Sequence, residues 1–149
     1  FGDDDNDVIS SFAGFLGHVY AGTRHDRTGA QVWRCAICDG SDWQQVVGDG
    51  FDSSHNVEAL SLITFEDALY CVTRNGEAGA QVWRTRDGTS WSRSGPSGYG
   101  DANNYRPYWD NSVAIFDDRL LIGTHNPANG GQIWMLLRQV FLPQTLSRK

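Results

Sequence analysis

The chain has 149 residues, which is the size of one domain and enough to bury a core if its parts stack on one another. Its 12 basic and 18 acidic side chains give a net charge of −6, which argues against a phosphate backbone as ligand and so against nucleic acid as a partner. No run of 18 apolar residues is present, so the sequence predicts no transmembrane segment. Six Trp, seventeen Gly and one Met favour short strands and many turns, and hence an all-β class.

The sequence repeats itself three times at a step of about 50 residues. The string Gly-Ala-Gln-Val-Trp-Arg occurs at 29–34 and 79–84, and Gly-Gly-Gln-Ile-Trp occurs at 130–134. In register with these strings, phenylalanine and threonine recur at Phe15, Phe65, Phe116, Thr23, Thr73 and Thr124. We therefore expect a single repeat domain over residues 1–149, with repeats of about 1–50, 51–98 and 99–149.

Each repeat has the pattern of four short strands separated by Gly, Asn and Asp turns. The first repeat predicts strands at 8–15, 19–23, 30–34 and 43–47. The second predicts strands at 59–65, 68–73, 80–85 and 91–93, with Glu66-Asp67 as a tight hairpin turn.

The third repeat departs from this plan at both ends. Its loop 105–112 is longer by three residues, and the apolar segment 135–143 replaces the Asp-Gly turn and the following Trp. We expect that segment to form a last strand that packs against another apolar surface. Terminal repeats are expected to be atypical because they cap or close the array.

Cys35 and Cys38 form a Cys-Ala-Ile-Cys pair in an insertion at a turn of the first repeat. A metal site needs two more ligands nearby, and none is obvious. The sequence therefore favours a short-loop disulfide or two free thiols over a zinc or redox site. Cys71 falls inside a predicted strand and is expected to be a small core residue.

Four-stranded units with a period near 50 residues are typical of β-propeller blades. The strings at 48–51, 69–75, 79–84, 87–91 and 98–104 together resemble tandem-repeat propeller proteins of the sialidase-like type, which are largely secreted bacterial proteins. Residues 85–91 also resemble a shortened Asp-box, the turn between the third and fourth strands of sialidase blades, which carries no catalytic residue. The resemblance implies a β-propeller of three four-stranded blades in an extracellular, secreted or cell-surface protein.

A β-trefoil is the alternative architecture, because it also has three repeats of four strands in about this length. Its ricin-type lectin family carries Gln-x-Trp in each repeat, and the triplets at 31–33, 81–83 and 132–134 match it. The longer shared strings favour the propeller. Three blades would leave two open edges, which tend to pair, while propellers typically have about 4 to 8 blades. We therefore expect a homo-oligomer that completes the ring, or a chain that is part of a longer propeller.

Strand parity places the links between repeats on the same surface as the connections between second and third strands. This surface is rich in Asn, Asp and Arg, which suit a glycan because amides and carboxylates bond sugar hydroxyls and Arg binds a carboxylate bidentately. The candidate ligand-binding residues are Arg24, His25, Arg74, Asn75, Tyr108, Trp109, His125 and Asn126.

His125 interrupts the series begun by Arg24 and Arg74, so equivalent positions cannot supply the three arginines that clamp a carboxylate in sialidases. No general acid and no Tyr-Glu nucleophile pair can be identified either. The sequence gives no catalytic residue.

Several recurring residues have a structural explanation. Asn6, Asn56 and Asn104 lie at loop ends, where an Asn side chain commonly bonds its own turn, and this role is favoured over ligand binding. Tryptophans that recur once per repeat are expected to lie in the core between neighbouring blades; these are Trp33, Trp83 and Trp134.

The acidic segment 1–7 resembles a calcium loop by its density of oxygen ligands, with Asp3, Asp5 and Asp7 as candidates. The aligned loops do not preserve these carboxylates, so a solvated acidic turn is favoured. We expect no other cofactor.

The sequence thus favours a non-catalytic binding module that recognises a carbohydrate through the polar loop face. Two other hypotheses stay open, a structural subunit of a larger extracellular assembly and a fragment of a sialidase-like glycoside hydrolase.

Overall fold

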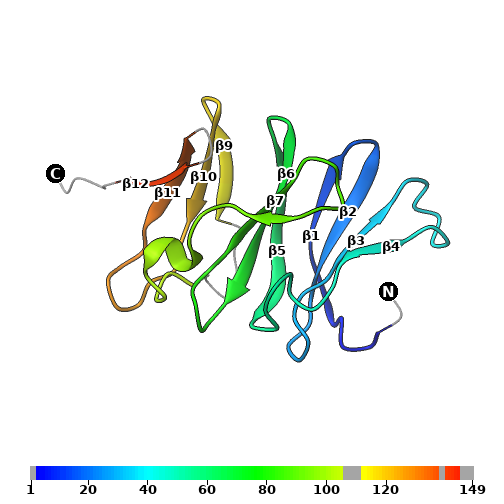
Figure 1. The fold of residues 1–149 in the computed structure, drawn as a ribbon, viewed down its shortest axis with the longest axis horizontal. Helices are drawn as coiled ribbons and strands as arrows, with labels where there is room; N and C mark the ends of the chain where they lie inside the picture. The colour runs from blue at the N-terminus through cyan, green and yellow to red at the C-terminus, as the bar shows by residue number, and fades with distance from the viewer. Residues whose placement is uncertain (1–2, 106–111, 138–139, 145–149) are drawn as a thin grey trace.

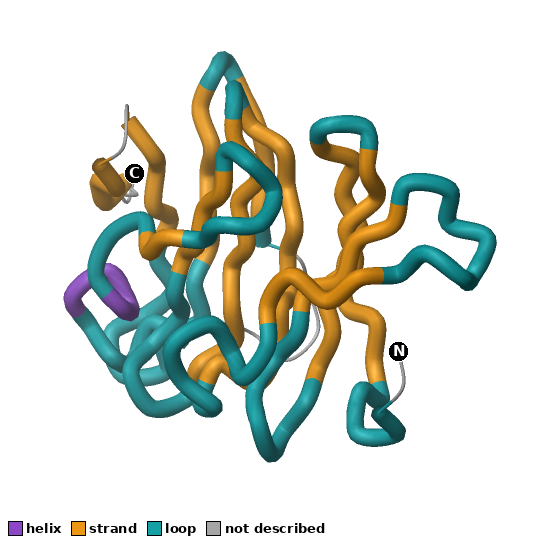
Figure 2. Tube along the Cα trace, turned by 45° about the vertical axis from the view of Figure 1, so that its right-hand side comes forward, coloured by secondary structure: helices purple, strands orange, loops and turns teal. Residues whose placement is uncertain are grey.

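A computed structural model describes residues 3–105, 112–137 and 140–144. Over these residues the chain is all-β, as predicted, with a single short 3-10 segment at Ser97–Gly100 (Figure 1). The strands form three successive units that lie side by side in chain order (Figures 1 and 2).

The strands of the first unit are β1 (Val8–Phe15), β2 (His18–Arg24), β3 (Val32–Cys35) and β4 (Gln44–Val47). Those of the second are β5 (Asn56–Phe65), β6 (Ala68–Asn75), β7 (Val82–Thr85) and β8 (Ser92–Arg93). Those of the third are β9 (Val113–Phe116), β10 (Arg119–Gly123), β11 (Ile133–Leu137) and β12 (Val140–Gln144). The apolar segment 135–143, expected as one last strand, is divided between the end of β11 and β12, and these two strands pair.

Within each unit, consecutive strands pair antiparallel to form a four-stranded sheet. A single bridge between Arg24 and Glu58 joins the first two units into a continuous sheet, while the third unit forms a separate sheet. Because all four strands of a unit belong to one antiparallel sheet, as in a propeller blade, the fold is propeller-like. This arrangement favours the propeller over the trefoil.

The third strands begin two residues later than predicted. Ala30 and Ala80 direct their N–H groups to the carbonyls of Asn56 and Asn104 at 2.7 and 2.8 Å, away from the ladder. Here the backbone ties each unit to the link that follows it, so the strand pairing starts only at Val32 and Val82.

Two apolar layers form the core. The first lies between the first two units and contains Phe15, Tyr20, Ala30, Val32, Val47, Ala59, Leu62, Leu69, Cys71 and Trp83. The second lies between the second and third units and contains Phe65, Ala68, Tyr70, Val72, Val82, Tyr99, Leu120, Ile122 and Leu136.

Trp83 and Trp134 lie at these layers, as expected, whereas Trp33 is half-buried in the first unit and belongs to neither layer. Trp83 is buried and stacks on Phe51 with ring centroids 4.8 Å apart, and Trp134 stacks on Tyr99 at the same distance. Each aromatic pair adds about 0.5 to 1.5 kcal/mol beyond the burial of its apolar area. Each link is therefore fastened to the third strand of the unit that follows it.

The states of the three cysteines agree with the interpretation favoured from the sequence. Cys35 and Cys38 form a disulfide, and the carboxylate of Asp42 accepts the backbone N–H groups of the enclosed turn. Cys71 is a fully buried free thiol. The described part of the chain contains no helix with the length and apolar character needed to cross a bilayer.

Candidate functional site

The links between units and the loops between second and third strands meet on one surface, as strand parity predicted. Contacts join the two kinds of segment: His55 Nε2 lies 2.8 Å from Glu77 Oε2, and Asn126 Nδ2 donates to Asp101 Oδ2 at 2.9 Å. We call this the polar loop surface; its described residues are 3–7, 24–30, 48–56, 74–80, 98–105 and 125–131. It lies at the end of the units away from hairpin turns such as Glu66-Asp67.

A buried chain of hydrogen bonds lies beneath this surface in the second unit. Asn56 Nδ2 and Trp83 Nε1 both donate to Gln81 Oε1, at 2.9 and 3.2 Å. Thr73 Oγ1 donates to Asn56 Oδ1 at 2.9 Å and accepts the backbone N–H of Gln81 at 3.3 Å. These bonds tie the link before the unit to its second and third strands.

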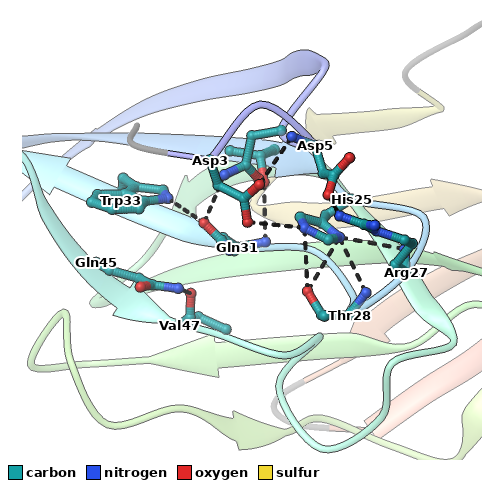
Figure 3. A network of polar contacts seen from close by, with 11 residues as sticks. Asp3, Asp5, His25, Arg27, Thr28, Gln31, Trp33, Gln45 and Val47 are labelled. Carbon is teal, nitrogen blue, oxygen red and sulfur yellow. Dashed lines mark hydrogen bonds and ion pairs between the residues drawn. The ribbon is translucent and has the colours of Figure 1, made fainter.

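The same four bonds recur in the other two units. The residues are Asn6, Thr23, Gln31 and Trp33 in the first unit, and Asn104, Thr124, Gln132 and Trp134 in the third. Figure 3 shows the Trp33 to Gln31 bond. The asparagines are therefore structural, as favoured. Asn56 and Asn104 also bond their own links, through the carbonyls of Gly50 and Gly98 at 2.8 and 2.9 Å.

Two of the predicted ligand-binding residues, Asn75 and Asn126, are buried and serve the backbone. Asn75 Oδ1 accepts the N–H groups of the next loop at 3.0 and 2.8 Å, and Asn126 Oδ1 does so at 3.1 and 2.8 Å. Their Nδ2 groups donate to Asn56 and Asn104. Both side-chain amides therefore stabilise the conformation of the loops that follow them.

His25 takes the same position in the first unit, where it is 1% exposed. Its Nδ1 accepts the backbone N–H groups of Arg27 and Thr28 at 3.4 and 3.1 Å (Figure 3). An imidazole whose Nδ1 accepts hydrogen bonds carries its proton on Nε2. The Nε2–H therefore donates to Asp3 Oδ2 at 3.2 Å.

Asp3, Asp5 and His25 form a cluster whose potential ligand atoms lie within 4.8 Å of one another. His25 has no lone pair free on Nε2 in this tautomer, and Asp5 forms an ion pair with Arg27. The polar atoms of the cluster are thus already bonded to other protein groups. Asp7 does not belong to it, so calcium binding by Asp3, Asp5 and Asp7 stays a prediction.

Arg24 and Arg74 lie in one cluster of charges near the bridge between β2 and β5. Arg24 binds the carboxylate of Asp26 with two nitrogens, and Arg74 Nη1 lies 3.8 Å from Glu58 Oε2. The hydrogen bonds from Arg24, then its charge and that of Arg74, hold the pKa of Asp26 below its usual value. A ligand carboxylate would have to compete with Asp26 and Glu58 for these guanidinium groups.

The remaining predicted residues belong to the third unit. His125 is exposed, and its backbone N–H donates to the backbone carbonyl of Tyr105 at 2.8 Å. The two rings meet edge to face, with their centroids 5.4 Å apart. Tyr108 and Trp109 lie outside the described residues. Among the described residues, the structure therefore brings the predicted ones to one surface unit by unit, and none of the pockets found there joins them.

A shallow cleft of about 510 Å³ opens on the polar loop surface between the first and second units. Its lining residues are Arg27, Thr28, Asp49, Phe51, Asp52, Ser53 and Ser54. The link bends sharply here, with positive φ at Asp49, Gly50 and Phe51. The sequence placed residues 24–27 and 52–56 on this surface, but it did not show that the loops enclose a cleft.

No protein-family model matches the chain, and no curated protein matches it. Among solved structures, the chain is similar to a thermostable family-43 glycoside hydrolase, with 13% identity and a TM-score of 0.45. The similarity covers 93% of this chain and 53% of the hydrolase chain, so this chain spans about half of that protein's length.

Proposed function

We propose that the protein is a non-catalytic binding module that recognises a carbohydrate in the cleft of the polar loop surface. The observation that carries the proposal is the composition of the cleft. Hydroxyl groups and carboxylates from two loops line the cleft together with one aromatic residue, Phe51, whose ring stacks on Trp83. Hydroxyls and carboxylates bond sugar hydroxyls, and an aromatic ring offers an apolar surface beside them.

The charges around the cleft favour a neutral sugar over an anion. Arg27 is paired with Asp5, and Arg93 Nη2 donates to Asp52 Oδ2 at 3.1 Å. Asp49 is exposed at the cleft, and the whole chain carries a net charge of −6. An anionic ligand would meet paired arginines and unfavourable long-range repulsion.

Binding of neutral and acidic oligosaccharides, screened on an array and then measured by calorimetry, tests this proposal. Asp49→Asn should weaken binding of a neutral sugar about tenfold, since it removes one charge-assisted acceptor. Asp118→Asn is the matched control, because Asp49 and Asp118 are both exposed with φ of 51° and 53°. Asp118 lies on the opposite hairpin turn and should leave binding unchanged.

Either of two results would contradict the proposal. One is an absence of saturable binding to any sugar of the array, and the other is equal binding by wild type and Asp49→Asn. Hydrolysis of a bound glycoside by the purified chain would contradict the non-catalytic assignment.

A further inference from the structure

Each unit has two faces, and the interfaces inside the chain use both faces of the second unit, one face of the first and one face of the third. We call the face turned to the preceding unit the leading face and the one turned to the following unit the trailing face. At the first interface, the trailing face of the first unit supplies Phe15, Tyr20 and Val32, and the leading face of the second supplies Leu62, Leu69 and Trp83. All six side chains are at most 8% exposed.

The second interface repeats this pairing one unit further along. The trailing face of the second unit supplies Phe65, Tyr70 and Val82, at positions equivalent to those in the first unit. The leading face of the third unit supplies Val113, Leu120 and Trp134. One type of contact, trailing face on leading face, therefore forms both layers of the core.

Among residues 3–105, 112–137 and 140–144, two faces of the array have no neighbouring unit. On the leading face of the first unit, Phe12 and Val19 are equivalent to Leu62 and Leu69. Phe12 is 61% and Val19 39% exposed, whereas Leu62 is 6% and Leu69 0% exposed.

The trailing face of the third unit shows the same contrast. Phe116 is 70% exposed, although the equivalent Phe15 and Phe65 are 8% and 7% exposed. Leu121 and Ile133 are half-buried, although Tyr70 and Val82 at the equivalent positions are buried. Exposed apolar faces of this kind mark sites of association.

We propose that the leading face of the first unit binds the trailing face of the third unit of a second copy of this chain. The argument is continuity, because the contact joins the same two types of face that already pair twice within the chain. It does not depend on the carbohydrate proposal. Each copy offers both faces, so two copies can use both at once, and six units lie within the range of closed propellers.

Light scattering of the purified chain across a range of concentrations tests the contact. We expect association to at least a dimer, twice the 16.5 kDa of one chain. Phe12→Ser and Phe116→Ser should each weaken association at least tenfold, because each places a hydroxyl in an apolar contact. Ile37→Ser is the control, since Ile37 is 77% exposed in the disulfide turn and lies on neither face.

Mixing the two variants distinguishes this contact from a self-complementary one. Phe12→Ser keeps an intact trailing face and Phe116→Ser keeps an intact leading face, so the mixture should associate more strongly than either variant alone. A chain that stays monomeric at every concentration would overturn the proposal. So would association that neither variant weakens, or a mixture that recovers nothing.

Discussion

His25 in the first unit makes the same kinds of contact as Asn126 in the third. Each accepts backbone N–H groups of the loop that follows it, and each donates to an aspartate of the link before its unit, Asp3 at 3.2 Å and Asp101 at 2.9 Å. A neutral imidazole thus replaces a carboxamide, because both present one acceptor and one donor.

This equivalence predicts that His25→Asn keeps the fold, whereas His25→Ala lowers the free energy of unfolding by about 1 to 3 kcal/mol. Alanine leaves the buried N–H groups of the loop without an acceptor. Urea unfolding followed by tryptophan fluorescence measures both variants. His55→Ala is the control, because the His55 side chain is 61% exposed and its pair with Glu77 contributes little. Equal losses for His25→Asn and His25→Ala would refute the equivalence.

The two donors that meet at Gln81 Oε1 lead to a second prediction. Gln81→Ala should lower the free energy of unfolding by about 2 to 4 kcal/mol, because Trp83 Nε1 and Asn56 Nδ2 lose a buried acceptor. Gln45→Ala is the control, since Gln45 is exposed and its amide donates within its own strand. Similar losses for the two variants, measured in urea, would argue against a special role for Gln81.

Much of the fold follows from recurrence in the sequence, while the roles of the polar residues do not. The repeated Gln-x-Trp and the Thr eight residues before it mark the strands and the core tryptophans. The bond from Asn56 to Gln81 spans 25 residues, and no local pattern indicates it. The Thr and Gln are eight residues apart in all three repeats, and this constant spacing is the sequence feature that indicates the buried chain of hydrogen bonds.

The candidate site shows a second limit of sequence reasoning. His25, Asn75 and Asn126 look like ligand-binding residues because they are polar and lie in loops. A polar loop residue gives the same pattern whether its partner is a ligand or a buried backbone group, because burial depends on loops brought together by the fold. The cleft at Phe51 likewise exists only where the loop between β2 and β3 meets the link after the first unit.

A third prediction concerns the close approach of two loops at Gly79. A Cβ on Gly79 would lie 2.5 Å from the Cα of Gly98, and Gly79 has a φ of +84°. Gly79→Ala should therefore cost at least about 2 kcal/mol of unfolding free energy, from the clash and the unfavourable backbone. Gly76→Ala, three residues earlier, meets nothing within 4 Å and should cost much less. Thermal unfolding of both variants decides, and equal midpoints would contradict the predicted crowding.

Asp101 makes the stability depend on pH. The backbone N–H of Asn103, followed by the amides of Asn129 and Asn126, lowers the pKa of Asp101 to about 2. The unfolded carboxyl has a pKa of about 3.9, so its stabilising effect is complete above about pH 4 and is lost as the pH falls through about 2. Asp101→Asn should therefore give a shallower loss of unfolding free energy between about pH 4 and 2. Parallel slopes for wild type and variant, from urea titrations at each pH, would count against this.

The thiols should react in two separate steps. Cys71 is fully buried in β6, and burial raises the pKa of its thiol, so neither access nor thiolate is available in the folded protein. The Cys35–Cys38 disulfide lies in a turn whose residues 36–40 are exposed, so a mild reductant should reach it. We expect no alkylation of the untreated protein, alkylation of two cysteines after reduction, and alkylation of Cys71 only in denaturant. Mass spectrometry of the alkylated peptides identifies each site, and Cys71→Ala serves as the control. Rapid alkylation of Cys71 without denaturant would show that the layer between the first two units opens readily.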